Sequence, residues 1–394
     1  MKIWQFFVFI LPFSTLPLTH YNSRIEVDKK QFFENLENIR ALIGPEKKFT
    51  VVLKSNAYGH GLVPMALLCQ EHPDVNGMAV FLLSEACCLR KIGIKKPILV
   101  LGGYDIPLKE AIYHNIDVTI HDTHTLKTIC TYAQKIKKVT RVHLKVDTGM
   151  GRLGFLPCKA VAAAQELTKS PYINLVGLYS HFSAANFDFA YTQKQFKIFQ
   201  KVVANLKKVN INPPLIHLAN SPIVLQCPEV LEATTMVRCG GITYGLYKEQ
   251  YLFDTAKKRM PSFNLKPIMQ WKTKIISLKK VPPKSYIGYE KTYQTQNETT
   301  IAIVPIGYYD GYYRELSNQG YMLVRDKLVP IIGRIAMNMA MLDVNNVPDA
   351  AVGDEVTIIG NRINIRARDI ALQLGYIYLE NLQSLNPAIP RTIV

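Results

Sequence analysis

The chain has 394 residues, of which 48% are hydrophobic and 20% are charged. This composition is typical of a folded protein and excludes an intrinsically disordered one. The net charge of +17 raises the question of a nucleic-acid partner. The lysines, however, occur singly and in pairs, without a long basic block or a recognised nucleic-acid motif, so we expect no nucleic acid to bind. The length exceeds that of one ordinary core and predicts two domains.

Residues 1–20 form a hydrophobic N-terminal extension that is too short to span a bilayer. It has one basic residue and no small-residue cleavage site, so we expect no membrane association and a cytoplasmic location, with export through a signal-like segment as the open alternative. The seven cysteines are an odd number without metal-ligand spacing. This pattern predicts free thiols in a reducing compartment and no metal site.

Short apolar runs alternate with helical patterns through the first part of the chain. We predict helices between the runs, at 63–71, 84–91, 123–135, 159–169 and 192–207. About eight such alternations predict a parallel (β/α)8 barrel of the TIM type over residues 21–258, with a doubly wound open sheet as the alternative. The apolar runs lie at 50–53, 78–82, 98–101, 117–120, 142–146, 175–179, 215–218 and 235–237.

The pattern changes in the last third of the chain. Helical periodicity fades, and alternating β-rich runs are separated by turn signals such as Pro282-Pro283 and Asp310-Gly311. We therefore predict a mostly antiparallel second domain over residues 259–394. Its strands are expected at 269–278, 300–305, 321–326, 328–332, 339–344 and 355–359.

Lys54 follows a buried-type strand at residues 49–53 and precedes a glycine-bearing turn. A lysine at such a position faces a desolvation cost that favours the neutral amine. A neutral amine on a rigid strand end is what a Schiff-base nucleophile needs. The alternative is a lysine whose ammonium reaches the solvent.

Active sites of TIM barrels are built from the C-terminal ends of the strands. There the hydroxyls of Tyr58 and Ser221, with two glycine amides, are typical components of a phosphate site. His181 can lie against an aromatic ring. Together with the Lys54 amine, which can bind an aldehyde, these groups indicate pyridoxal phosphate as cofactor. The remaining residues at these ends are Lys145, Arg238, Gly240 and Gly241.

Five motifs in both predicted domains resemble the alanine racemase family, a class of pyridoxal-phosphate enzymes, and the resemblance extends over residues 21–391. It implies a homodimer with shared active sites that interconverts L- and D-alanine and supplies D-alanine for peptidoglycan. The motifs are VVLKSNAYGHG at 51–61, HLKVDTGMGRLG at 143–154, HLANS at 217–221, VRCGG at 237–241 and PIGYYDG at 305–311.

The resemblance also implies two bases. Lys54 holds the cofactor as an internal aldimine and then acts on one face of the substrate Cα, while a tyrosine of the partner subunit acts on the other. Alignment on Thr292-Tyr293 assigns that tyrosine to Tyr289, with Tyr286 as the alternative if the register shifts. A phenol with its ordinary pKa of about 10 is a poor base at neutral pH and needs nearby cations. Arg152 is the family's candidate for this role.

In the family, an arginine at the position of Arg238 contacts the pyridine nitrogen. A guanidinium can only donate, so the nitrogen stays unprotonated and side reactions such as transamination are limited. Lys145 occupies a position that is often a carbamylated lysine, which would turn a buried cation into an anion beside arginine. His217 is expected to hydrogen-bond near Arg238, and His60 to support the turn after Lys54. His143 is expected to be structural or exposed.

Tyr308 and Met337 complete the implied substrate site, with the backbone amide of Met337 toward the substrate carboxylate. The chain departs from the family at Asn338, where an aspartate is usual, and at Leu379, where a tyrosine normally narrows the entrance. These departures leave the substrate range open. Three alternatives therefore stand beside alanine racemisation: a racemase of broader specificity, a basic amino-acid decarboxylase, and a non-catalytic pyridoxal-phosphate-binding protein.

Overall fold

The computed structural model describes residues 22–247 and 249–394, and the predicted extension at residues 1–20 lies outside this part of the chain. The described residues form two compact units. The larger comprises Glu26–Gln270, Ile359–Leu385 and Arg391–Val394, and the smaller comprises Trp271–Ile358, Asn386–Pro390 and the residues up to Ile25. The boundary at 258/259 stays a prediction, because each unit combines segments that are separate in the sequence.

The larger unit contains an eight-stranded sheet of order β8-β7-β6-β5-β4-β3-β2-β9 in which all neighbouring strands pair in parallel. Two backbone hydrogen bonds join the ends of this order, from Thr235 N to Ile216 O (2.9 Å) and from Arg238 N to Ala219 O (3.1 Å). The predicted barrel is confirmed. Its strands are β2 (Lys48–Val52), β3 (Gly77–Leu82), β4 (Ile98–Gly103), β5 (Asp117–Ile120), β6 (Thr140–Lys145), β7 (Ile173–Tyr179), β8 (Leu215–His217) and β9 (Met236–Cys239).

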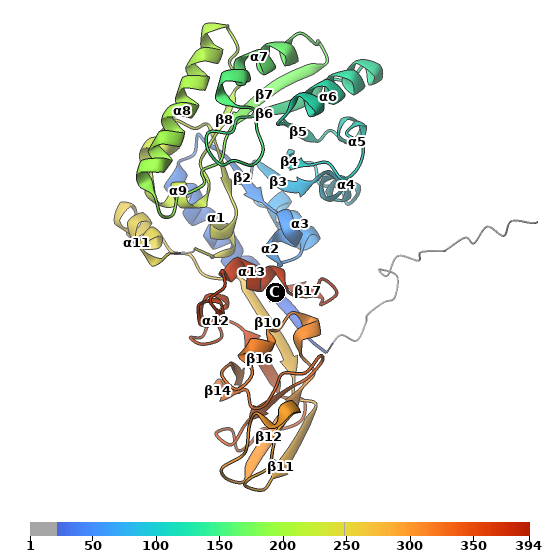
Figure 1. The fold of residues 1–394 in the computed structure, drawn as a ribbon, viewed down its shortest axis with the longest axis vertical. Helices are drawn as coiled ribbons and strands as arrows, with labels where there is room; N and C mark the ends of the chain where they lie inside the picture. Colours follow the sequence, from blue (N-terminus) through green and yellow to red (C-terminus); the bar gives the residue numbers. More distant parts are fainter. Residues whose placement is uncertain (1–21, 248) are drawn as a thin grey trace, which may run out of the picture. The chain divides into compact units, whose positions relative to one another are not determined.

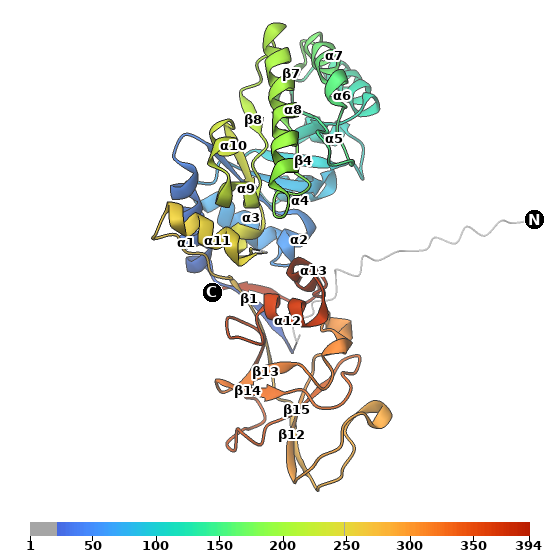
Figure 2. The same ribbon diagram turned by 60° about the vertical axis from the view of Figure 1, so that its left-hand side comes forward.

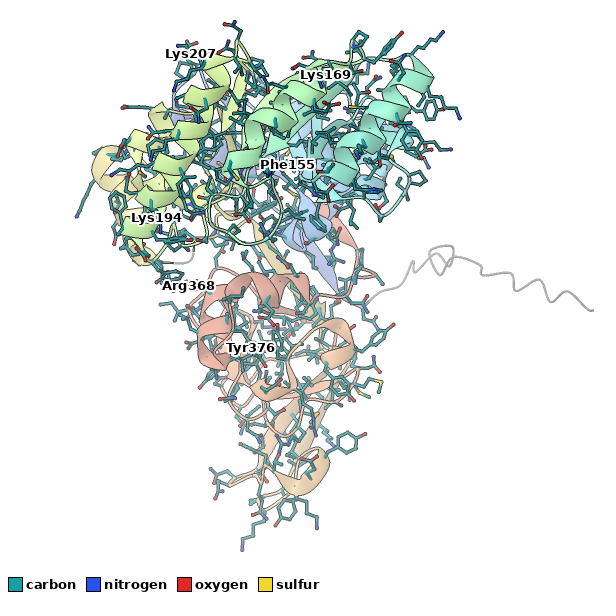
Figure 3. The ribbon with its side chains drawn as sticks, turned by 45° about the horizontal axis from the view of Figure 1, so that its top comes forward. Phe155, Lys169, Lys194, Lys207, Arg368 and Tyr376 are labelled. Carbon is teal, nitrogen blue, oxygen red and sulfur yellow. The ribbon has the colours of Figure 1, made fainter. Side chains whose placement is uncertain are left out.

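Helices cover the outside of the barrel, as the views of α6, α7 and α8 beside β5 to β7 show (Figures 1 and 2). Along α8, Phe196, Phe199 and Leu206 are buried, whereas Lys194 and Lys207 lie on the outer surface (Figure 3). The helices of this unit are α1 (Lys29–Ile43), α2 (Lys54–Tyr58), α3 (Leu62–Glu71), α4 (Leu83–Lys91), α5 (Lys109–Tyr113), α6 (Thr123–Ile136), α7 (Pro157–Thr168), α8 (Phe189–Lys208), α9 (Ser221–Gln226), α10 (Pro228–Glu232), α11 (Gln250–Arg259), α12 (Ala367–Leu374) and α13 (Tyr378–Gln383), with the 3₁₀ turn η2 (Gly241–Tyr244).

The smaller unit is mostly antiparallel β-structure, as predicted. β11, β12 and β15 form one sheet, and β14, β13, β16 and β10 are neighbours in another. The single strand predicted at 269–278 is two strands, because Ile275 N bonds to Asp354 O and Ile276 N bonds to Ile303 O. The elements are β10 (Met269–Lys274), β11 (Ser277–Val281), η3 (Tyr289–Lys291), β12 (Thr299–Val304), η4 (Tyr308–Asp310), η5 (Arg314–Leu316), β13 (Tyr321–Val324), β14 (Lys327–Pro330), β15 (Ala340–Asp343) and β16 (Glu355–Ile359). Of the two remaining short strands, β1 (Arg24–Val27) has residues in both units, and β17 (Arg391–Ile393) belongs to the larger one.

A small apolar core of Ile287, Ile301 and Ile332 supports the segment between β11 and β12 in this unit. Among residues 22–247 and 249–394, no helix is both long and apolar enough to cross a bilayer.

Candidate active site

The residues that the sequence placed at the strand ends of the barrel surround one cavity of about 800 Å³. The whole lining belongs to the larger unit. All nine residues predicted for the barrel site therefore line the same cavity, as expected if they bind a single ligand. They are Lys54, Tyr58, Lys145, Arg152, His181, Ser221, Arg238, Gly240 and Gly241.

Lys54 is held by an unusual backbone turn. Ser55, Asn56, Ala57 and Tyr58 all have left-handed φ angles between 51° and 56°. For residues other than glycine this conformation costs roughly 1–2 kcal/mol each, so the surrounding contacts must enforce it. The Nδ1 atom of His60 lies 3.0 Å from Ala57 O and 3.1 Å from Tyr58 O. The predicted supporting role of His60 is confirmed.

The cavity is strongly cationic. Burial and then the charges of Arg152 and Arg238 lower the pKa of the Lys54 amine below its ordinary value. The same causes lower the pKa of Lys145 to about 8. Both amines therefore give up a proton more easily than a surface lysine does, and the site as a whole attracts an anion.

One wall of the cavity has the groups of a phosphate site. The Gly240 N–H donates to Ser221 Oγ at 3.1 Å. A Cβ atom at Gly240 would lie 2.2 Å from the hydroxyl oxygen of Tyr58, so a glycine is needed for the phenol to approach the backbone. Burial raises the pKa of Tyr58 and keeps it a neutral hydroxyl. Two hydroxyls and a side-chain-free backbone fit the phosphate of pyridoxal phosphate.

Arg238 is 5% exposed and held by three hydrogen bonds. Its Nη1 donates to His217 Nδ1 and to His217 O, both at 2.7 Å, and its Nη2 donates to Ser180 O at 2.9 Å. The predicted contact with His217 is confirmed. Burial lowers the pKa of Arg238 to about 10, so the guanidinium stays charged at neutral pH. These contacts use three of its five N–H groups, and the side chain lines the cavity.

His181 also lines the cavity, and burial followed by the neighbouring charge of Arg238 puts its pKa well below the ordinary value. It is therefore a neutral ring at neutral pH. Asp147 organises the loop that carries Arg152: its carboxylate accepts four backbone N–H groups, including those of Gly149 (2.9 Å) and Arg152 (3.0 Å). Burial opposes ionisation, but these donors hold the pKa of Asp147 below its ordinary value. The carboxylate thus fixes the Arg152 backbone.

The remaining predicted site residues belong to the smaller unit. Tyr289, Tyr308 and Met337 line one cavity of about 420 Å³ together with Arg314, Ile335 and Ala336. The Tyr289 side chain is 67% exposed. Next to it, the Glu290 carboxylate pairs with Arg314 and Arg334, each at 2.9 Å. Tyr286 does not contribute to the lining of this cavity, a difference that favours Tyr289.

Several residues of the barrel interior were not predicted from the sequence. His143 is 1% exposed, so the alternative that it is exposed is wrong, and it bonds to His217 and Asp117. A signal was available, because His143 lies two residues before Lys145 on β6 and so shares its face of the strand. Leu379 and Ile377 line the large cavity; Leu379 was singled out from the sequence, and Ile377 was not.

Comparisons with known proteins agree with this geometry. Residues 27–248 match the family described as alanine racemase, N-terminal domain, and residues 268–393 match alanine racemase, C-terminal domain. An alanine racemase of Halothermothrix orenii is 36% identical over 371 residues, which are 93% of this chain and 95% of the relative. One of Leptospira interrogans is 36% identical over 382 residues, 95% and 96% of the two chains.

Solved structures give the same result. An alanine racemase of Clostridium difficile superposes with a TM-score of 0.88 at 33% identity, covering 95% of this chain and 96% of that one. The alanine racemase of Bacillus anthracis with bound L-Ala-P has a TM-score of 0.84 at 30% identity, covering 95% of each chain.

Proposed function

The chain belongs to the alanine racemase family, whose members depend on pyridoxal phosphate, and we propose that it interconverts L- and D-alanine with Lys54 and Tyr289 as the two bases. One observation carries the proposal. A lysine amine with a lowered pKa, a charged and buried arginine, and a phosphate-type wall face the same cavity.

The cofactor site is assigned to the barrel. Lys54 would bind the aldehyde, Tyr58 and Ser221 would hold the phosphate with the backbone of Gly240 and Gly241, and Arg238 would donate to the ring nitrogen. When bound, pyridoxal phosphate supplies the electron sink that lets the Cα–H of an amino acid ionise. Arg238 cannot deliver a proton to the ring at neutral pH, and it thereby favours return of the proton to Cα over transamination.

The two bases act on opposite faces of Cα. The neutral Lys54 amine takes or returns the proton on one face, and the Tyr289 hydroxyl of the partner subunit returns or takes it on the other. The Cα–H bond that breaks on one face is replaced by a new one on the other, so the reaction needs no oxidant and no net proton. Arg152, Tyr308 and the Met337 amide are assigned to the substrate.

We assign Lys145 to an orienting role beside Arg152. A pKa of about 8 leaves part of this amine neutral near neutral pH. A neutral amine can add carbon dioxide through a new N–C bond and release one proton to the solvent, which gives a carbamate anion. The resulting anion would face Arg152 and Arg238, whose charges lower the pKa of the unmodified amine. The exchange of a buried cation for an anion between two arginines is favourable.

The proposed enzyme is a homodimer, because Tyr289, Tyr308 and Met337 are exposed on a compact unit separate from the barrel. The seven cysteines are free thiols, which is in keeping with a cytoplasmic location and with the supply of D-alanine for peptidoglycan there.

The test is an L-to-D assay of the purified protein with three variants. Lys54→Ala should lose both the yellow colour of the lysine-bound cofactor and racemisation. Tyr289→Phe should keep the colour and lose racemisation by about 10²–10⁴-fold, the usual contribution of a general base. Tyr286→Phe is the matched control and should stay within about twofold. Full activity in Tyr289→Phe would remove that residue from its role, and colour without any turnover in the unsubstituted protein would identify a cofactor carrier.

Broader racemase specificity is the second candidate. Leu379, at the position where the family normally has a tyrosine, lines the cavity together with Ile377. Racemisation of serine and lysine at rates near that of alanine would support it, and alanine alone as substrate would reject it.

A further inference from the structure

A continuous hydrogen-bonded chain of four buried side chains extends from Arg238 into the barrel interior. Arg238 Nη1 lies 2.7 Å from His217 Nδ1, and His217 Nε2 lies 2.9 Å from His143 Nδ1. His143 Nε2 lies 3.3 Å from Asp117 Oδ2. Each of the four residues is at most 5% exposed. We call these four residues the Arg238 relay.

Only one arrangement of protons satisfies the whole relay. An arginine has no acceptor, so His217 must accept at Nδ1 and carry its proton on Nε2. That proton is donated to His143 Nδ1, so His143 in turn carries its proton on Nε2 and donates it to the Asp117 carboxylate. The Asp117 carboxylate can only accept, so it fits this end of the relay, and every donor in the relay faces an acceptor.

The surrounding residues hold the relay in place. A Cβ atom at Gly177 would lie 2.0 Å from His143 Nδ1, so the glycine on β7 leaves the room that this imidazole occupies. Tyr179 stacks on His217 with ring centroids 4.6 Å apart. At the far end, Arg141 donates to both oxygens of Asp117 at 2.9 and 3.0 Å.

The far end of the relay lies at the opposite end of the barrel from Lys54. Asp117, Arg141 and His143 line a second cavity of about 360 Å³, together with residues from the N-terminal halves of the strands. The relay thus spans the barrel from the cofactor side to this second cavity.

We propose that His143 and Asp117 are positioning residues that fix the orientation of the Arg238 guanidinium through the tautomer of His217. The proposal rests on the assigned contact of Arg238 with the cofactor ring. If His143 could not accept the hydrogen bond from His217 Nε2, the His217 proton could move to Nδ1. The His217 Nδ1–H and the Arg238 N–H would then both be donors and would repel each other. Arg238 would then lose this hydrogen bond and its fixed orientation, and control over side reactions would weaken.

The first test needs neither cofactor nor turnover. In ¹⁵N-histidine-labelled full-length apo-protein at neutral pH, nitrogen chemical shifts should show both His143 and His217 as neutral Nε2–H tautomers. The spectra of His143→Asn and His217→Asn assign the signals. A doubly protonated ring at either position, or a Nδ1–H tautomer, overturns the relay whatever the enzyme's reaction is.

The second test compares two substitutions of His143 in the holoenzyme. Asn offers an oxygen close to the Nδ1 position and so preserves the acceptor, whereas Leu removes it. We expect His143→Leu to shift the absorption maximum of the bound cofactor and to raise the ratio of transamination to racemisation at least tenfold, and His143→Asn to restore both toward the original values.

Thr234→Val is the matched control, because it removes another buried hydrogen bond of the larger unit, from the Thr234 hydroxyl to Leu231 O at 2.9 Å, outside the relay. It should change thermal stability but neither the spectrum nor the ratio. A His143→Leu spectrum and ratio equal to those of Thr234→Val would show that His143 is only structural. If the unsubstituted enzyme fails to racemise alanine, the proposed function fails, while the histidine tautomers still decide the relay.

Discussion

At the scale of single residues, Lys145 shows how much the environment of one amine decides. Its pKa of about 8, against an ordinary 10.5, results from burial and from the charges of Arg152 and Arg238. Between about pH 8 and 10.5 the unfolded chain binds the proton more tightly, so stability rises with pH in this window. Below pH 8 the Lys145 amine is charged in both the folded and the unfolded chain, and the full cost of burying this charge lowers the stability.

We therefore expect Lys145→Met to stabilise the apo-protein at pH 7 by on the order of 1–3 kcal/mol in carbon-dioxide-free buffer, and to flatten the rise between pH 8 and 10.5. Urea unfolding at several pH values measures both effects. Lys207→Met, on the outer face of α8 (Figure 3), should change stability by less than about 0.5 kcal/mol. If Lys145→Met is instead destabilised, Lys145 is already carbamylated and its carbamate is paired with arginine.

Gly240 gives a steric prediction at the same scale. Its added Cβ would meet Tyr58 at 2.2 Å from the hydroxyl oxygen and 2.7 Å from Cζ, and the Tyr58 ring is buried. We expect Gly240→Ala to weaken pyridoxal-phosphate binding at least tenfold, measured by titration of the apo-protein. In Gly77→Ala the nearest neighbour is Pro97 O at 3.2 Å. Cofactor affinity should there stay within about twofold, and equal losses in both variants would contradict the steric argument.

At the scale of elements, periodicity located the barrel strands well because buried parallel strands are short, apolar and separated by amphipathic helices. The strand predicted at 117–120 has these bounds in the structure, and each of the others shifts by one or two residues at one or both ends. The left-handed turn at Ser55–Tyr58 could not be predicted, because four successive positive φ angles in residues other than glycine depend on tertiary contacts. The short helices α12 and α13 were missed for lack of a long periodic pattern.

Helix α6 offers a test of backbone strain away from the site. It ends at Ile136 and is capped by Lys137, an exposed residue with φ 56° and ψ 40°. Because glycine adopts this conformation without the cost of a Cβ, Lys137→Gly should stabilise the protein by about 0.5–1 kcal/mol without changing activity. Lys127→Gly, inside the same helix, should destabilise it by about 1 kcal/mol. Denaturant midpoints at constant m-value measure both, and a loss of stability in Lys137→Gly would be contrary to the assigned strain.

At the scale of the whole molecule, the candidate site could be predicted only in part. Residues at strand ends converge because a parallel barrel brings those ends together, and family motifs supplied Tyr289, Tyr308 and Met337. The contact of Arg238 with His217 was predicted, but the continuation of the relay to His143 and Asp117 was missed, because the relay joins four strands across the barrel and no spacing in the sequence reveals those contacts. The division into compact units also crosses the sequence, since residues 359–385 belong with the barrel and Asn386–Pro390 do not.

The assignment of Lys54 and Tyr289 to different chains of one active site makes a quantitative prediction. Lys54→Ala and Tyr289→Phe are each expected to be inactive. In a mixed dimer, one chain carries Lys54→Ala and the other carries Tyr289→Phe. One of its two active sites then contains both substitutions and the other contains neither. Mixed dimers isolated through a different tag on each chain should therefore recover about half of the wild-type rate. Dimers of two differently tagged Lys54→Ala chains are the control and should stay inactive. If both bases came from the same chain, each site of the mixed dimer would lack one of them, and no activity would return.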